Sequence, residues 1–91
     1  MNIQPIIPVK ADERGERYDI GVIKFVVRKA GTVSADHQHS EPEIMYLIKG
    51  QIKLTVGENT QVIDFPAKIS VAANEYHKLE ALTDFVLLYE R

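Results

Sequence analysis

The chain has 91 residues, the length of a single small domain with a modest core. It contains no cysteine, which excludes disulfide frameworks, thiolate metal sites and cysteine nucleophiles, and which fits a reducing compartment, so we expect the cytoplasm. The formal net charge is −2 without any basic run, which argues against nucleic acid as a partner.

Residues 1–17 are expected to form an N-terminal arm or edge strand followed by a loop, within a domain that spans residues 1–91. Four aliphatic residues near the start are interrupted by Pro5 and Pro8. Proline removes a backbone donor, so such a segment belongs at a sheet edge. The same prolines break the long apolar stretch that a signal peptide requires. Residues 11–17 are charged and contain a glycine, which indicates a solvated turn.

The rest of the chain is a series of short strands separated by turn residues. Residues 18–28 are predicted to be one strand, and its centre, residues 25–27, is apolar on both faces, which indicates burial on both sides or an interface. Further strands are predicted at residues 32–39, 43–49, 51–56, 61–65, 68–72, 77–79 and 85–89. The last of these is the longest apolar run, and it is too short to span a bilayer. No window has a helical period, so an antiparallel sandwich or barrel is predicted.

The stretch from Gly31 to Gly50 carries the strongest chemical signal. His37 and His39 are two residues apart, so in an extended strand both imidazoles lie on one face, about 6.5 Å apart along the chain. Two neutral imidazoles at that spacing can bind one metal ion. Glu43 follows after a short turn and supplies an oxygen ligand. The stretch therefore predicts a metal site.

This spacing resembles the first motif of the cupin superfamily. That motif consists of glycine, five residues, His-x-His, three residues, glutamate, six residues and glycine. Every fixed position is filled here, by Gly31, His37, His39, Glu43 and Gly50. The resemblance implies a small single-domain cupin, an all-β antiparallel double-sheet jelly-roll barrel.

The second motif of the family is degenerate in this chain. Anchored on His77, it has Pro66, Ala72, Asn74 and Ala81 where the family has glycine, proline, glycine and asparagine. The resemblance makes His77 the third imidazole ligand. Asparagine tolerates positive φ better than any residue except glycine, so the turn that leads to His77 is still expected to form.

The resemblance thus implies one divalent transition metal ion per chain, bound by His37, His39, Glu43 and His77. Three imidazoles and one carboxylate suit an octahedral manganese, iron, nickel or cobalt ion, and zinc is a further option. Each histidine alone could be an ordinary surface or core residue, yet all three histidines of the chain fall on motif positions. Glu41 is interpreted as a solvated turn residue.

In cupins the metal lies inside the barrel, so the residues near Glu43 are expected to surround it. Met45, Leu47 and Leu54 are candidates for an apolar wall, although small barrels fill with side chains and these residues could be plain core. An acid or base would have to reach the same cavity.

Three residues are predicted as catalytic acid or base groups. Glu75 and Tyr76 immediately precede His77, and Tyr46 lies in the strand after Glu43. Each could also be an ordinary turn or strand residue.

Two functions remain open. The first is a metal-dependent enzyme that acts on a small molecule, and the resemblance implies isomerase- or oxygenase-like chemistry on a sugar or an acid. The second is a non-catalytic, metal-dependent binding or sensor module. The complete ligand set favours the first, and the shortness of the chain favours the second. A homodimer is expected, because small cupins resemble one another in pairing and an open sheet edge needs cover.

Overall fold

The computed structural model describes residues 1–90, apart from the side chains of residues 35–37. That range contains ten strands and no helix, so it has no helix able to cross a membrane. The strands are β1 (Lys10–Asp12), β2 (Gly15–Ile20), β3 (Ile23–Arg28), β4 (Val33–His37), β5 (Glu43–Lys49), β6 (Gln51–Val56), β7 (Asn59–Asp64), β8 (Ala67–Val71), β9 (His77–Ala81) and β10 (Phe85–Glu90). The predicted all-β class is confirmed.

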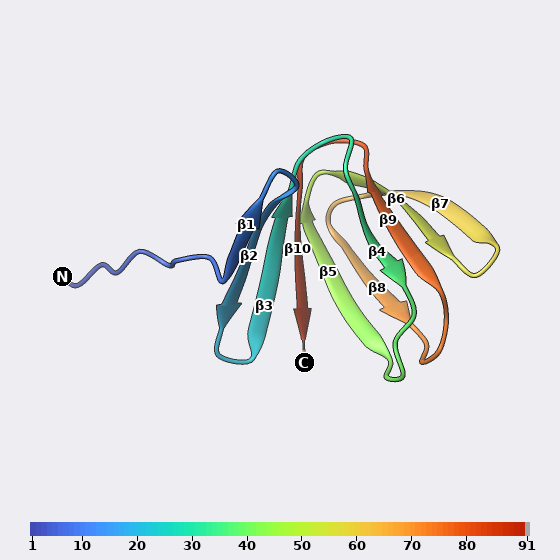
Figure 1. Cartoon of the computed structure of the whole chain (residues 1–91), viewed down its shortest axis with the longest axis horizontal. Helices are drawn as coiled ribbons and strands as arrows, with labels where there is room; N and C mark the ends of the chain where they lie inside the picture. The colour runs from blue at the N-terminus through green and yellow to red at the C-terminus, as the bar shows by residue number, and fades with distance from the viewer. Residues whose placement is uncertain (91) are drawn as a thin grey trace.

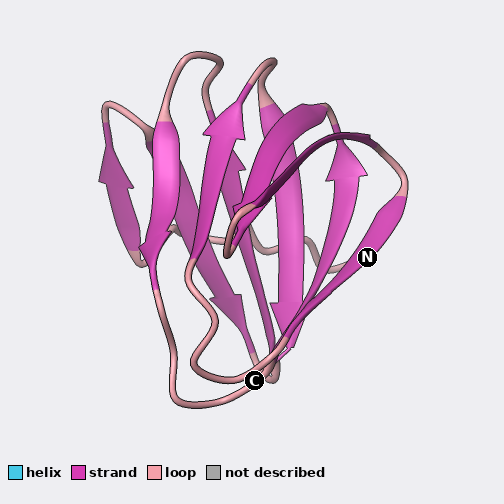
Figure 2. Ribbon diagram, turned by 90° about the vertical axis from the view of Figure 1, so that its right-hand side faces the viewer, coloured by secondary structure: helices cyan, strands magenta, loops and turns pink. Residues whose placement is uncertain are grey.

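The strands form two antiparallel sheets that face each other, as Figures 1 and 2 show. The larger sheet has the order β1-β2-β3-β10-β5-β8, and the smaller has the order β4-β9-β6-β7. Strands that are far apart in the chain are neighbours in both sheets. The double-sheet architecture implied by the sequence resemblance is therefore present.

The segment predicted as one strand, residues 18–28, is instead a hairpin of β2 and β3. Ile20 is paired with Ile23, so Gly21 and Val22 form the connecting turn. Gly21 has a φ of 60°, which glycine adopts without steric cost. The prediction was wrong here because a glycine between apolar residues can start a two-residue turn without any polar signal. The charged residues before it, predicted as a loop, belong mostly to β1 and β2.

The first nine residues have no regular structure and extend away from the two sheets (Figure 1). One backbone hydrogen bond, from Val9 N–H to the Arg17 carbonyl oxygen at 2.8 Å, connects the end of this segment to β2. Ile3 and Ile7 remain 78% and 80% exposed. The segment thus has the extended form of an arm, and its contact with a partner stays a prediction.

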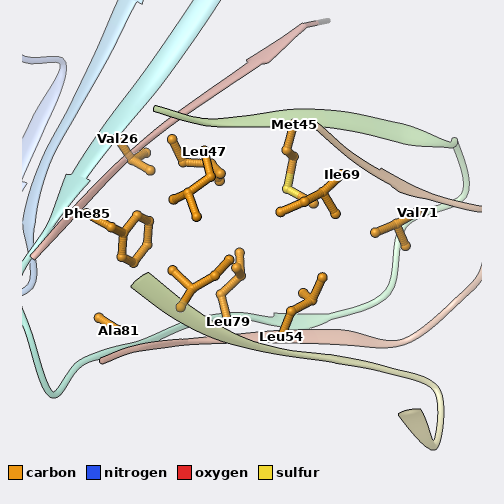
Figure 3. Close-up of a cluster of buried hydrophobic side chains, with 11 residues drawn as sticks. Val26, Met45, Leu47, Leu54, Ile69, Val71, Leu79, Ala81 and Phe85 are labelled. Atoms are coloured by element: carbon orange, nitrogen blue, oxygen red, sulfur yellow. The ribbon is translucent and has the colours of Figure 1, made fainter. Parts of the chain in front are cut away.

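Aliphatic side chains from both sheets form the core (Figure 3). The buried residues are Val26, Met45, Leu47, Ile52, Leu54, Ile69, Val71, Leu79, Ala81, Phe85 and Leu87. Most come from alternating positions of a strand, because successive side chains point to opposite faces of a sheet. Full burial of one such large side chain stabilises the fold by about 1.5–3 kcal/mol. Leu47 and Leu54, which were considered as a cavity wall, belong to this packed cluster.

Gly50, the last glycine of the first motif, connects β5 to β6 at a point of close backbone approach. Its φ is 91°, a conformation that other residues rarely adopt. A Cβ atom at this position would overlap the Asp84 carbonyl oxygen and lie 2.9 Å from the Cα of Phe85. The motif glycine is therefore required by the packing of the turn against the start of β10.

Candidate metal centre

Three predicted ligands converge at one end of the space between the sheets. His39 follows β4, Glu43 begins β5 and His77 begins β9. The Glu43 Oε2 atom lies 3.2 Å from His77 Nε2 and 3.5 Å from His39 Nε2. An ion with ligand bonds of about 2.1 Å separates neighbouring ligand atoms by about 3.0–3.4 Å. The His39, Glu43 and His77 group could therefore bind a metal ion.

A backbone carbonyl fixes the orientation of the His77 ring. His77 Nδ1 lies 3.2 Å from the carbonyl oxygen of Glu75. A carbonyl oxygen only accepts, so this hydrogen bond requires a proton on Nδ1, and in the neutral ring the lone pair is then on Nε2. In the neutral ring, Nε2 and the Glu43 carboxylate are two acceptors 3.2 Å apart, and either a shared metal ion or a proton removes their repulsion. This arrangement is the one that metal-binding histidines use.

Exposure increases across the group from His77 to His39. The His77 side chain is 1% exposed, that of Glu43 22% and that of His39 42%. The deep ligand is held rigidly by its surroundings, whereas the outer ligand borders solvent. Such a site has an open side, where a small molecule could reach a bound ion.

The turn that leads to His77 forms despite its degenerate motif. Asn74 has a φ of 62°, so the expectation that asparagine would take the place of the family's glycine is confirmed. The Asn74 N–H donates to the His39 carbonyl oxygen at 2.6 Å, and the Gly57 N–H donates to the Tyr76 carbonyl oxygen at 2.8 Å. The turn is thus connected directly to the segment that carries His39.

The side chain of His37, the fourth predicted ligand, lies outside the described residues. Its backbone is described, and it pairs with His77 where β4 meets β9. A place for His37 among the ligands therefore stays a prediction.

The three predicted acid or base residues lie around the group rather than in it. Glu75 is exposed and contributes its carbonyl oxygen to His77. Tyr76 is 36% exposed. Tyr46 lies on the face of β5 opposite to the buried Met45, where its hydroxyl donates to Glu90 Oε1 at 3.4 Å. Their catalytic roles stay predictions.

Two cavities adjoin the group, and both are lined by His39, Glu43 and Tyr89. The outer cavity has a volume of about 290 Å³ and includes the turn at residues 40–42. The inner cavity has a volume of about 260 Å³. The inner one is further lined by the polar residues Arg17, Arg28 and Ser34 and by the apolar residues Val26, Met45, Leu79 and Leu87.

The sequence reasoning placed one face of the last strand among the lining, but it did not name Arg17, Arg28 or Tyr89 as cavity residues. A signal for two of them exists in the alternation of the strands. Arg28 follows the buried Val26 by two residues, and Tyr89 follows the buried Leu87 by two. Both therefore occupy inward-facing positions. For Arg17 the signal appears only after the pairing of β2 with β3 is known.

The sequence matches no established family profile and no curated protein, but the fold matches solved structures. Salicylate 1,2-dioxygenase from Pseudoaminobacter salicylatoxidans, as an adduct with gentisate, matches with a TM-score of 0.69 and 19% identity over 74% of this chain and 18% of that chain. A cupin 2 domain-containing protein from Halorhodospira halophila matches with a TM-score of 0.70 and 10% identity over 74% of this chain and 48% of that chain.

A predicted oxalate decarboxylase from Thermotoga maritima has a TM-score of 0.68 and 21% identity over 74% of this chain and 61% of that chain. The match to this chain thus spans between 18% and 61% of the length of these three neighbours. At such identities the likeness establishes the fold, whereas function depends on the site.

Proposed function

The chain has the cupin fold, and we propose that it is a divalent-metal-binding cupin that acts on a small molecule. The observation that carries this proposal is the position of Glu43 Oε2, 3.2 Å from His77 Nε2 and 3.5 Å from His39 Nε2. We propose His37 as the fourth ligand and manganese, iron, nickel, cobalt or zinc as the metal. When bound, the ion would polarise oxygen atoms of the small molecule.

The residues around the cavities have separate tasks in this proposal. Glu75, through its carbonyl oxygen, orients His77 toward the ion. The apolar side chains of Leu79 and Leu87 limit the access of water to the inner cavity. Tyr89 lines both cavities, so its hydroxyl is our candidate for donating a hydrogen bond or moving a proton.

The reaction class follows from the fold and from the neighbours. We propose isomerase- or oxygenase-like chemistry on a sugar or an acid, with Glu75, Tyr76 and Tyr46 kept as acid or base candidates beside Tyr89. The neighbours include a dioxygenase and a predicted decarboxylase, which supports chemistry on an acid.

The alternative is a non-catalytic binding or sensor module. One observation favours it. The residues that line the two cavities do not include Glu75, Tyr76 or Tyr46. Tyr89 is then the remaining candidate for proton transfer. If Tyr89 does not transfer a proton either, the described side chains around these cavities would only bind a ligand.

Metal analysis of purified protein tests the centre itself. We expect about one ion per chain in the wild type and a loss of most of it in His39→Ala and Glu43→Ala. The matched control is Glu41→Ala, which removes a neighbouring carboxylate that is not part of the group and should leave the metal content unchanged. Equal metal content in His39→Ala and in the wild type would contradict the proposed site.

A turnover measurement separates the enzyme from the sensor. The metal-loaded protein is incubated with gentisate, oxalate or a reducing sugar. Consumption of the added compound is followed by mass spectrometry, and the control contains the metal ion without protein. Conversion that is lost in Tyr89→Phe while binding persists supports the enzyme and the role of Tyr89. Binding without conversion would assign the sensor.

We also propose a homodimer and, from the absence of cysteine, a cytoplasmic location. Apolar residues on the outer face of the larger sheet support the dimer. The rings of Tyr18 and Phe25 stack at 4.5 Å, and Ile20 and Ile23 nearby are each 43% exposed. Light scattering at micromolar concentration should give twice the mass of the chain, and deletion of residues 1–9 should weaken the association. A monomer mass for the full chain would contradict the dimer.

A further inference from the structure

Two arginines occupy inward-facing positions of the larger sheet. Arg17 in β2 is paired with Val26 in β3, and Val26 is in turn paired with Leu87 in β10. Val26 and Leu87 are both buried in the core. Directly paired residues lie on the same face of a sheet, and so do residues two apart in one strand, which adds Arg28 to this face. Both arginines line the inner cavity.

Within the described part of the chain, these half-buried arginines have few hydrogen-bond partners and no ion-pair partner. The Nε atoms of Arg17 and Arg28 are buried and have no hydrogen-bond partner among the side chains and backbone that the structure describes. Arg28 Nη1 reaches only the carbonyl oxygens of Glu16 and Val27, at 3.3 and 3.4 Å. No ion pair among the described residues includes either arginine. Both side chains are half-buried, and a buried donor without a partner gains nothing for the fold, so these Nε atoms are available to a ligand.

The charged groups around Arg28 favour the binding of an anion at this end of the cavity. Burial lowers the pKa of Arg28 below its usual value, and the positive charges of Arg14 and, more weakly, Arg17 act in the same direction, while Asp12 and Tyr89 oppose them. The Asp12 carboxylate is already paired with Arg14 at 3.2 Å. This end of the cavity is therefore positively charged in a chain whose net charge is −2.

The inner cavity connects the arginines to the metal centre. Its lining includes His39 and Glu43 as well as Arg17 and Arg28. In the order β2-β3-β10-β5, three strand spacings of about 4.8 Å separate the strand of Arg17 from that of Glu43. Arg28, in β3, lies one strand nearer to Glu43, and the long arginine side chains shorten both separations. A molecule that contacts both the strand of Arg17 and the metal centre must therefore span the inner cavity.

We propose that Arg17 and Arg28 bind the carboxylate of a small elongated acid whose other end carries the oxygen atoms directed to the metal centre. The second half of this proposal rests on the proposed function, whereas the carboxylate subsite stands on the arginines themselves. The guanidinium fork matches a carboxylate with two parallel hydrogen bonds, and these would include the buried Nε donors that have no partner among the described residues. The substrate or ligand class is then an acid with two functional ends and not a neutral sugar.

The test compares two probes that differ only at one end. 2-Oxoglutarate and 2-oxopentanoate share the 2-oxo acid group and the chain of five carbons, but only the first ends in a second carboxylate. They are titrated into the full-length, ¹⁵N-labelled, zinc-loaded protein. We expect at least tenfold tighter binding of 2-oxoglutarate. We also expect the Nε–H signals of Arg17 and Arg28 to shift with the 2-oxoglutarate titration.

Variants assign the effect to the two side chains. Arg17→Gln and Arg28→Gln should each lower the affinity for 2-oxoglutarate at least tenfold and leave that for 2-oxopentanoate within threefold. The matched control is Arg14→Gln, because Arg14 is a nearby charged residue that is not among those lining the cavity. This variant should change both affinities less than threefold. If a glutamine variant does not fold, Arg17→Lys or Arg28→Lys retains the charge without the fork, and a loss of preference in the lysine variant supports the same assignment.

Metal content, measured on the same samples, separates this proposal from the proposed function. Metal-loaded protein that binds both probes equally overturns the carboxylate subsite and leaves the metal centre standing. Protein that holds no metal, but whose Arg17 and Arg28 signals still shift with 2-oxoglutarate, supports the subsite and removes the metal centre. Unshifted arginine signals at saturating 2-oxoglutarate overturn the subsite in either case.

Discussion

The space between the two sheets is divided into a packed region and an open one, and their linings differ in chemistry. In the packed region, Leu47, Ile52 and Phe85 are at most 1% exposed and belong to one cluster of side chains from both sheets (Figure 3). In the open region, the lining includes two arginines, a histidine and a carboxylate around a cavity of about 260 Å³. The same two sheets therefore build a stabilising core and a polar cavity side by side.

The contrast indicates which residues serve the fold and which serve a ligand. Aliphatic side chains in the packed region gain free energy from burial, and their loss leaves a void. The arginines of the open region gain little, because their Nε atoms have no hydrogen-bond partner among the described residues. Such departures from good local packing concentrate at functional sites. Stability measurements on the two regions should therefore give opposite results.

The largest effect is expected in the packed region. Leu47→Ala should lower the free energy of unfolding by about 2–5 kcal/mol, because Leu47 is fully buried and its removal leaves a cavity. Urea denaturation measures the change. The matched control is Ile48→Ala at the next position, which is 48% exposed and should cost much less. Equal losses in the two variants would contradict the division into two regions.

Metal should stabilise the open region by an amount that depends on pH. A free ion at one hundred times its dissociation constant should add about 2.7 kcal/mol to the free energy of unfolding. Imidazoles bind metal only in the neutral form, and free imidazole titrates near pH 6.5, so this gain should be present at pH 8 and decline as pH falls below about 6. Thermal unfolding with and without zinc at pH 8 and 5.5 measures it. The same gain at both pH values would rule out histidine ligands.

The turn before β9 should show an intermediate effect. Asn74→Ala should lower the free energy of unfolding by about 1–2 kcal/mol, because alanine is strained at a φ of 62°, whereas Asn74→Gly should be nearly neutral. Both variants retain the N–H that donates to the His39 carbonyl oxygen. Thermal denaturation of the pair separates backbone strain from the loss of the side chain. A similar cost in both would show that the asparagine side chain itself matters.

The smallest effect is expected at the arginines. Arg17→Met should change the free energy of unfolding by less than about 1 kcal/mol or increase it, because it removes a charge without an ion-pair partner in the described chain and retains apolar bulk. The measurement is urea denaturation under the conditions used for Leu47→Ala. A loss above about 2 kcal/mol would assign Arg17 to the packed structure and count against the carboxylate subsite.

Local patterns in the sequence were sufficient for the fold class and for part of the site. Alternating aliphatic residues and glycine or proline turns predict an all-β sandwich, because side-chain alternation and turn chemistry depend on neighbours in the chain. The spacing of His39 and Glu43 places both near one turn for the same reason. His77 entered only through the resemblance to the cupin second motif, yet the structure brings it to within 3.2 Å of Glu43.

Other features depended on pairing between distant strands, which no local pattern contains. The register of β2 with β3 turns Arg17 toward the cavity, and the pairing of β10 with β3 and β5 brings Tyr89 to the same space. Tyr46 points away from the cavity because the preceding residue, Met45, points inward and successive side chains of a strand lie on opposite faces. A shift of one residue in register exchanges the two faces of a strand, so only the assembled sheets decide which polar side chains meet inside. By itself, therefore, the sequence determined the strands after Gly31 and the metal-ligand spacing, whereas the tertiary structure decided the pairing of the first three strands and what surrounds the metal centre.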